Sequence, residues 1–117
     1  MQALDAFSRV ALQSLLQAWL RGELPLHADI PHEIEEIDGQ FIRNLISNPL
    51  DQAAVRCFAD VARLMGLETV AEFVESPEVL LRLKEMGVDY AQGNLEHRPE
   101  PIDRLTDIAT RAGATAL

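Results

Sequence analysis

The hydrophobic residues of the chain recur at helical spacing and at strand-like spacing in alternating segments. The first helix is predicted over residues 3–21, and its apolar positions cover more than one narrow stripe: Leu4, Phe7, Val10, Ala11, Leu15, Leu16, Trp19 and Leu20. A helix that is apolar around so much of its circumference needs burial on several sides. We therefore expect its Trp19 surface to lie at an interface.

Residues 23–33 carry Pro25 and Pro31, which favours an irregular linker. A strand is predicted over residues 35–38 and ends at Gly39, and a short helical turn is predicted over residues 41–45.

The next helix has clearer boundaries, because Asn48-Pro49 is typical of a helix start and Gly66 of a left-handed end. Its inward side is predicted from residues at helical spacing: Val55, Phe58, Ala62 and Met65. Cys57 lies in the middle of this helix beside Phe58, so we expect a packed thiol and not a nucleophile.

Two further strands and two helices follow. Strands are predicted over residues 68–72 and 88–92, separated by a helix that begins at Ser76-Pro77 and ends at Gly87. That helix should bury Val79, Leu83 and Met86. Pro99 and Pro101 predict a loop, and the last helix is predicted over residues 102–112, with Leu105 and Ile108 facing inward.

Strand and helix thus alternate three times, which predicts an α/β chain of about three parallel βα units after an N-terminal helix. Ligands of parallel α/β sheets bind at the carboxyl ends of the strands. Asp38, Glu72, Glu75 and Gln92 all fall at such ends. Glu72 and Glu75 are either solvated turn residues or acids that line a site.

Composition narrows the possible functions. The chain has 117 residues, enough for one domain, and a net charge of −9, which opposes binding to nucleic acid or to anionic membranes. Cys57 is the single cysteine, so no internal disulfide forms and a reducing compartment is favoured. With no apolar run of membrane-spanning length and no basic start of a signal peptide, we expect a cytoplasmic protein.

Three segments carry a family resemblance: "EIDGQFIRNL", "LMGLETVAEFVES" and "GVDYAQGNLEHRPEP". In this order they resemble the closing third of an EAL domain, the phosphodiesterase module that cleaves cyclic di-GMP. The corresponding family motifs read roughly KIDGxFV, LGxxxxAEGVE and AQGYxxxRPxP. The likeness covers residues 35 to about 105 and implies a partial TIM-like (β/α) barrel. It divides the chain into an N-terminal helix and linker, residues 1–34, and an EAL-like βα segment, residues 35–117.

The resemblance also implies roles at matching positions. Glu72 matches a glutamate that helps hold one of two catalytic metals, and Glu75 matches one that steadies a loop over the site. Gln92 matches the glutamine beside the bound nucleotide, and Asp38 the aspartate of KIDG. Arg98 is a further candidate for a phosphate contact.

Departures from the family pattern argue against catalysis. The chain contains no Glu-Ala-Leu motif, and Glu36 stands where KIDG has its lysine. Asn94 replaces the usual aromatic residue, and Asp5 in "LDAFS" is all that matches a further metal motif. A full (β/α)₈ barrel takes about 250 residues, so the chain corresponds to at most half of one.

We therefore expect a truncated EAL-like protein that is catalytically inactive and has a regulatory or protein-interaction role related to cyclic di-GMP signalling. Its partner would be a second copy in a homodimer, or another signalling protein, and cyclic di-GMP would bind weakly or not at all. The alternative is half of a split phosphodiesterase whose Mg²⁺ or Mn²⁺ site is completed by another chain. A piece of a larger gene product is a third possibility. No cofactor is expected in the isolated chain.

Overall fold

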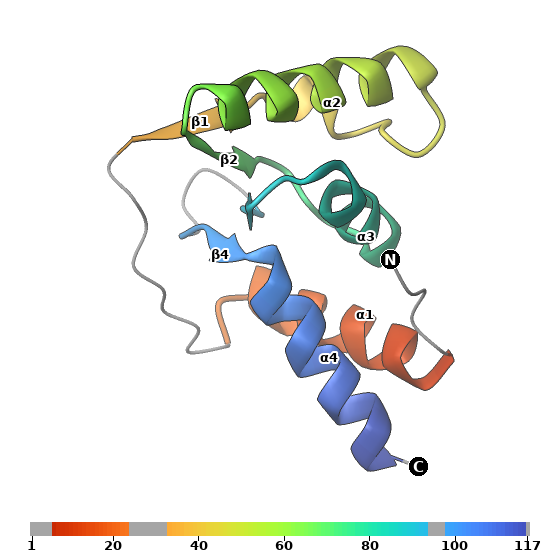
Figure 1. Ribbon diagram of the computed structural model, residues 1–117. Coiled ribbons are helices and arrows are strands. Elements are labelled where there is room, and N and C mark those ends of the chain that lie inside the picture. The colour runs from red at the N-terminus through yellow and green to blue at the C-terminus, as the bar shows by residue number, and fades with distance from the viewer. Residues whose placement is uncertain (1–5, 24–32, 94–97, 117) are drawn as a thin grey trace.

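A four-stranded sheet in the order β1–β2–β3–β4 organises the fold (Figure 1). The computed structural model describes residues 6–23, 33–93 and 98–116. β1 (Ile34–Ile37), β2 (Glu68–Ala71) and β3 (Tyr90–Ala91) are parallel, which confirms the predicted α/β class. β4 (Glu100–Pro101) pairs antiparallel with β3, so the prediction of a simple loop at these residues was wrong. Proline is compatible with β4 because β4 is an edge strand.

Helices connect the parallel strands as expected. The 3₁₀ helix η1 (Gly39–Phe41) and α2 (Pro49–Leu64) lie between β1 and β2, and α3 (Pro77–Met86) lies between β2 and β3. The Asn48 side chain accepts hydrogen bonds from the backbone at the start of α2, and Ser76 does the same for Val79 in α3. Gly87 ends α3 with a φ of 85°, a conformation that favours glycine. These boundaries confirm the sequence-based ones.

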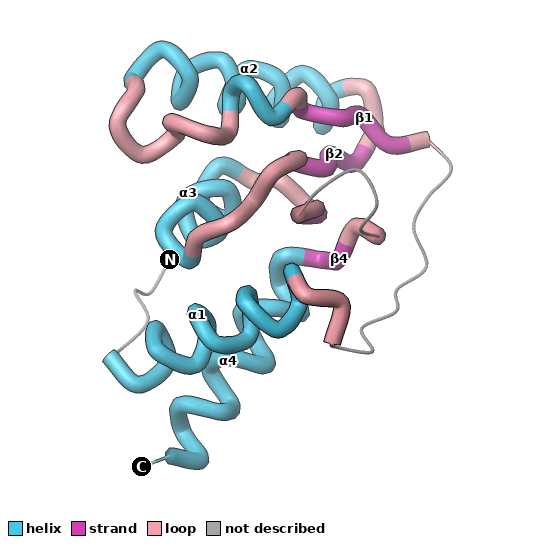
Figure 2. Tube along the Cα trace, turned by 180° about the vertical axis from the view of Figure 1, so that it is seen from behind, coloured by secondary structure: helices cyan, strands magenta, loops and turns pink. Residues whose placement is uncertain are grey.

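α1 (Ala6–Leu20) and α4 (Ile102–Ala116) pack against each other on the opposite side of the molecule from α2 (Figures 1 and 2). Leu12 and Leu16 are almost fully buried in the core, and Trp19 is only 5% exposed within a single chain. The apolar surface of Trp19 is therefore covered by this chain itself and needs no second copy. A homodimer stays a prediction, but its expected contact at Trp19 was wrong.

α2 differs from the sequence-based pattern in the side chains it buries. Val55, Ala59 and Ala62 face the core, whereas Phe58 is 41% and Met65 is 68% exposed. Cys57 is exposed too, so the expectation of a packed thiol was also wrong. The hydrophobic pattern was ambiguous because α2 carries apolar residues on two faces. In the structure, the face with the smaller side chains packs against the core.

Within the ranges that the structure describes, no helix is both long enough and apolar enough to cross a membrane. Most of the buried apolar side chains form one cluster, which draws on α1, α2, α3, α4 and the sheet.

The packing of α1 is testable with a matched pair of substitutions. Leu12→Ala should lower the free energy of unfolding by about 2–5 kcal/mol, because it leaves a cavity in the core. Val10→Ala, at a position that is 68% exposed on the same helix, should change it by about 0.5 kcal/mol or less. Urea denaturation followed by Trp19 fluorescence measures both, and equal effects would contradict the described packing.

Candidate functional site

The carboxyl end of β2 is bonded to the strands on both sides. The Glu72 N–H donates to the Ile37 carbonyl at 3.3 Å, and the Gln92 N–H donates to the Ala71 carbonyl at 2.9 Å. One step further, the Val74 N–H donates to the Gln92 carbonyl at 3.0 Å. The carboxyl ends of β1, β2 and β3 therefore meet at one edge of the sheet, as the sequence predicted.

Three carboxylates gather at this edge: Glu36, Asp38 and Glu72, called here the acidic group. β1 and β2 pair in register, Glu36 with Val70 and Ile37 with Ala71, so the pleat directs Glu36, Asp38 and Glu72 to the same face. Partial burial of Glu72 raises the pKa of its carboxyl, and the neighbouring charges of Glu36 and then Asp38 raise it further. The acidic group is thus a set of like charges around a Glu72 carboxyl whose pKa is raised.

Asp38 also has a structural role. Its Oδ1 accepts a hydrogen bond from the Gln40 N–H at 3.0 Å, which caps η1. A carboxylate used in this way is fixed in direction at the start of the turn. Of the predicted binding residues, Asp38 and Glu72 are the pair that the structure brings together.

Phe73 is an unusual residue directly after Glu72. Its φ is +58°, the single positive φ among the described non-glycine residues. The Phe73 ring lies so close to Gly39 that a Cβ added there would approach ring atoms Cε2 and Cγ to 2.8 and 2.9 Å. The guanidinium carbon of Arg43 stands 4.9 Å from the ring centroid. The turn after β2 is therefore interlocked with the turn after β1.

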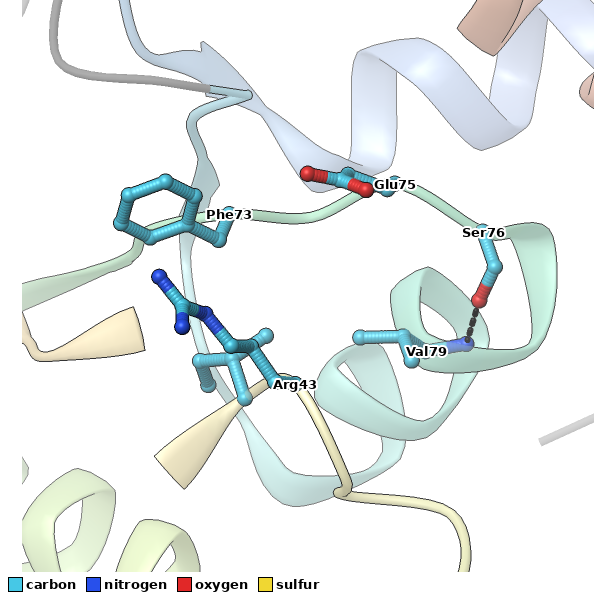
Figure 3. A pocket seen from close by; sticks show the side chains of 6 residues that line it. Arg43, Phe73, Glu75, Ser76 and Val79 are labelled. Carbon is cyan, nitrogen blue, oxygen red and sulfur yellow. Dashed lines mark hydrogen bonds between the residues drawn. The ribbon is translucent and has the colours of Figure 1, made fainter. Parts of the chain in front are cut away.

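A pocket of about 430 Å³ opens beside this contact (Figure 3). It is lined by Ile42, Arg43, Phe73, Glu75, Ser76 and Val79. Glu75 lines this pocket, and its charge is not among those that raise the pKa of Glu72. The two glutamates of the sequence motif therefore belong to different surroundings.

Of the remaining candidates, Gln92 follows β3 next to the carboxyl end of β2, Arg98 precedes β4, and the others lie outside the described residues. Gln92 is 9% exposed, and its backbone belongs to the hydrogen bonds that join β3 to β2. Arg98 is exposed just before β4. Asp5 and Asn94 lie outside the described residues.

Sequence reasoning missed Phe73 and Arg43. The available signal was the motif itself, in which glycine stands at the position of Phe73. A glycine replaced by phenylalanine in a left-handed conformation indicates that surrounding contacts hold the backbone there.

The residues present do not fit the pair of metals that the resemblance implies. Two-metal hydrolysis needs several oxygen ligands around ions about 3.5–4 Å apart. Across the part of the chain that the structure describes, no three Asp, Glu, His or Cys side chains are arranged to hold a metal ion. The acidic group is therefore not a ready metal site.

Comparisons with known proteins agree with the motifs. The family model described as "EAL domain" matches residues 21–99. Cyclic di-GMP phosphodiesterase PdeB of Shewanella oneidensis is 47% identical over 74 residues, which is 63% of this chain and 9% of PdeB. Cyclic di-GMP phosphodiesterase PdeF of Escherichia coli is 42% identical over 77 residues, 65% of this chain and 10% of PdeF. The chain thus spans about a tenth of these relatives.

Solved structures show the same partial match. The EAL enzyme Bd1971 in its cAMP-bound form superposes with a TM-score of 0.52 at 29% identity, over 68% of this chain and 22% of that protein. The described fold therefore corresponds to part of an EAL TIM barrel.

The interlock of the two turns gives a double-mutant prediction. Gly39→Ala should lower the free energy of unfolding by about 1–3 kcal/mol, because the new methyl group meets the Phe73 ring. In a Phe73→Gly background the same substitution should cost less than about 0.5 kcal/mol. Chemical denaturation of the four proteins measures the coupling, and an unchanged cost of Gly39→Ala in both backgrounds would contradict the contact.

Proposed function

Because the chain belongs to the EAL domain family, we propose that it is a non-catalytic EAL module with a regulatory or protein-binding role in cyclic di-GMP signalling. The link to this signalling rests on relatives that carry the name cyclic di-GMP phosphodiesterase, PdeB and PdeF among them. A cytoplasmic location is part of the proposal.

The observation that carries the proposal is the position of Glu36 beside Glu72. The motif that this segment resembles has lysine where the chain has Glu36, so a positive charge is replaced by a negative one. Partial burial raises the pKa of Glu72 most, and the charges of Glu36 and then Asp38 raise it further. A dianionic phosphodiester such as cyclic di-GMP is repelled by the same charges. The acidic group thus disfavours both the binding of cyclic di-GMP and its cleavage.

Phe73 supports the proposal by its bulk. Its ring covers Gly39 at the carboxyl end of β1, the edge at which parallel α/β sheets bind their ligands. The positive side chain of Arg43 is engaged with the Phe73 ring. The Phe73 ring therefore occupies space that a nucleotide would need, and the positive charge of Arg43 is directed to the ring.

A second candidate is half of a split phosphodiesterase. One support is that Glu72 and Gln92 stand at adjacent strand ends. A second is that β1 is an edge strand, since β2 is its single neighbour among the described strands. Another chain could pair with the open edge of β1 and supply the missing metal ligands. Mg²⁺ or Mn²⁺ would bind only in that assembly.

The two candidates differ in a hydrolysis assay. We expect the purified chain with Mg²⁺ or Mn²⁺ to leave cyclic di-GMP intact by chromatography, and Glu72→Ala to behave identically. Calorimetry should give a dissociation constant weaker than about 100 μM, a binding free energy near −5.5 kcal/mol. Glu36→Lys should tighten binding, because it removes a negative charge and adds a positive one.

Turnover that Glu72→Ala abolishes would overturn the non-catalytic proposal and favour the split enzyme. Saturable binding in the low micromolar range by the unaltered chain would contradict the role given to Glu36. Gln40→Lys is the matched control, because it adds a positive charge nearby on exposed η1 and leaves the acidic group unchanged.

A further inference from the structure

Two opposite charges line the pocket beside Phe73 without forming an ion pair. Arg43 and Glu75 both belong to its lining (Figure 3). Among the described residues, neither side chain has an ion-pair partner, and the two do not pair with each other. A cation and a carboxylate that share a pocket without neutralising each other suit a ligand that brings a counter-charge to each.

The Phe73 ring holds the positive charge in position. The guanidinium carbon of Arg43 lies 4.9 Å from the ring centroid. A guanidinium over a ring interacts through its flat face, so the N–H groups along its edge can still donate to a carboxylate. In Figure 3, Arg43 and Phe73 stand at one side of the pocket, and Glu75 lies between them and Ser76. Because both charges line one pocket of about 430 Å³, a single small ligand can contact both.

The rest of the lining is largely apolar and fixed in place. Ile42 is fully buried, and Val79 is buried at the start of α3. The Ser76 hydroxyl accepts a hydrogen bond from the Val79 N–H at 3.2 Å, which fixes this wall of the pocket. The Phe73 ring is held against Gly39. Preformed apolar walls with a few polar groups are typical of small-molecule sites.

The two charges restrict the kind of ligand. A simple anion is opposed by Glu75 and by the net charge of −9, and a simple cation is opposed by Arg43. A zwitterion meets both side chains with the opposite charge and adds no net charge. We propose that the pocket binds a free α-amino acid with an apolar side chain. Its carboxylate binds Arg43, its ammonium group binds Glu75, and its side chain packs against the apolar wall.

Calorimetry with L-leucine and two matched analogues tests the proposal. Isocaproate is leucine without the ammonium group, and isoamylamine is leucine without the carboxylate. We expect L-leucine to bind with a dissociation constant of about 0.1–1 mM. Each analogue should bind at least about 10-fold more weakly, because it leaves one charge of the pocket without its counter-charge.

Substitutions in the pocket assign each charge to its partner. Glu75→Gln should weaken the binding of L-leucine about 10-fold and remove its preference over isocaproate. Arg43→Gln should likewise remove the preference over isoamylamine. Glu78→Gln and Arg56→Gln are the matched controls, because both residues are exposed and lie outside the pocket lining. Neither control should change the affinity.

Three results would overturn the proposal. The first is the absence of saturable L-leucine binding up to about 10 mM. The second is isocaproate that binds as tightly as leucine, which would indicate a simple anion site. The third is full affinity in both Glu75→Gln and Arg43→Gln, which would place the ligand elsewhere.

The role of Arg43 is tested without relying on one variant. Arg43→Gln also removes the contact with Phe73, so circular dichroism is needed to show that the variant keeps its fold. The comparison of leucine with isoamylamine in the unaltered chain tests the same contact without a substitution. None of these results depends on whether the chain binds or hydrolyses cyclic di-GMP.

Discussion

The hydrogen bonds at the carboxyl end of β2 position every other part of the candidate site. Glu72 is bonded through its N–H to β1, and Gln92 through its N–H to the end of β2. β1 and β3 are thus both hydrogen-bonded to the last residues of β2. The turn that follows β2 therefore has little conformational freedom. Phe73 makes that turn with a positive φ, at a cost of about 1–2 kcal/mol for a residue other than glycine. The contact of its ring with Gly39 and Arg43 offsets this strain.

This arrangement explains why the site is acidic and crowded. The register of β1 and β2 directs Glu36 and Asp38 to the face that Glu72 shares, and the Phe73 ring occupies the space next to them. An EAL-type strand edge is preserved, but Glu36 stands where the motif has lysine and Phe73 where it has glycine. The fold is retained, and the proposed loss of catalysis rests on these two departures from the family motifs.

Local signals made much of the fold predictable. Asn48, Ser76 and Gly87 act through bonds and backbone angles within a few residues, so the sequence places those helix boundaries correctly. Glu72 and Asp38 were found because strand ends of a parallel sheet share one edge. β4 was missed, since a two-residue strand depends on its partner β3 and not on its own residues. The sequence alone likewise cannot tell which of the two apolar faces of α2 is buried, because the choice depends on neighbours that accommodate Val55, Ala59 and Ala62.

The central claim is that the acidic group does not form a catalytic metal site in this chain. A titration of the purified protein with Mn²⁺, followed by electron paramagnetic resonance, measures this most directly. We expect no saturable binding below about 1 mM, and the same signal for the unaltered chain and for Glu72→Gln. Two Mn²⁺ ions bound per chain at micromolar concentration, and lost in Glu72→Gln, would contradict it.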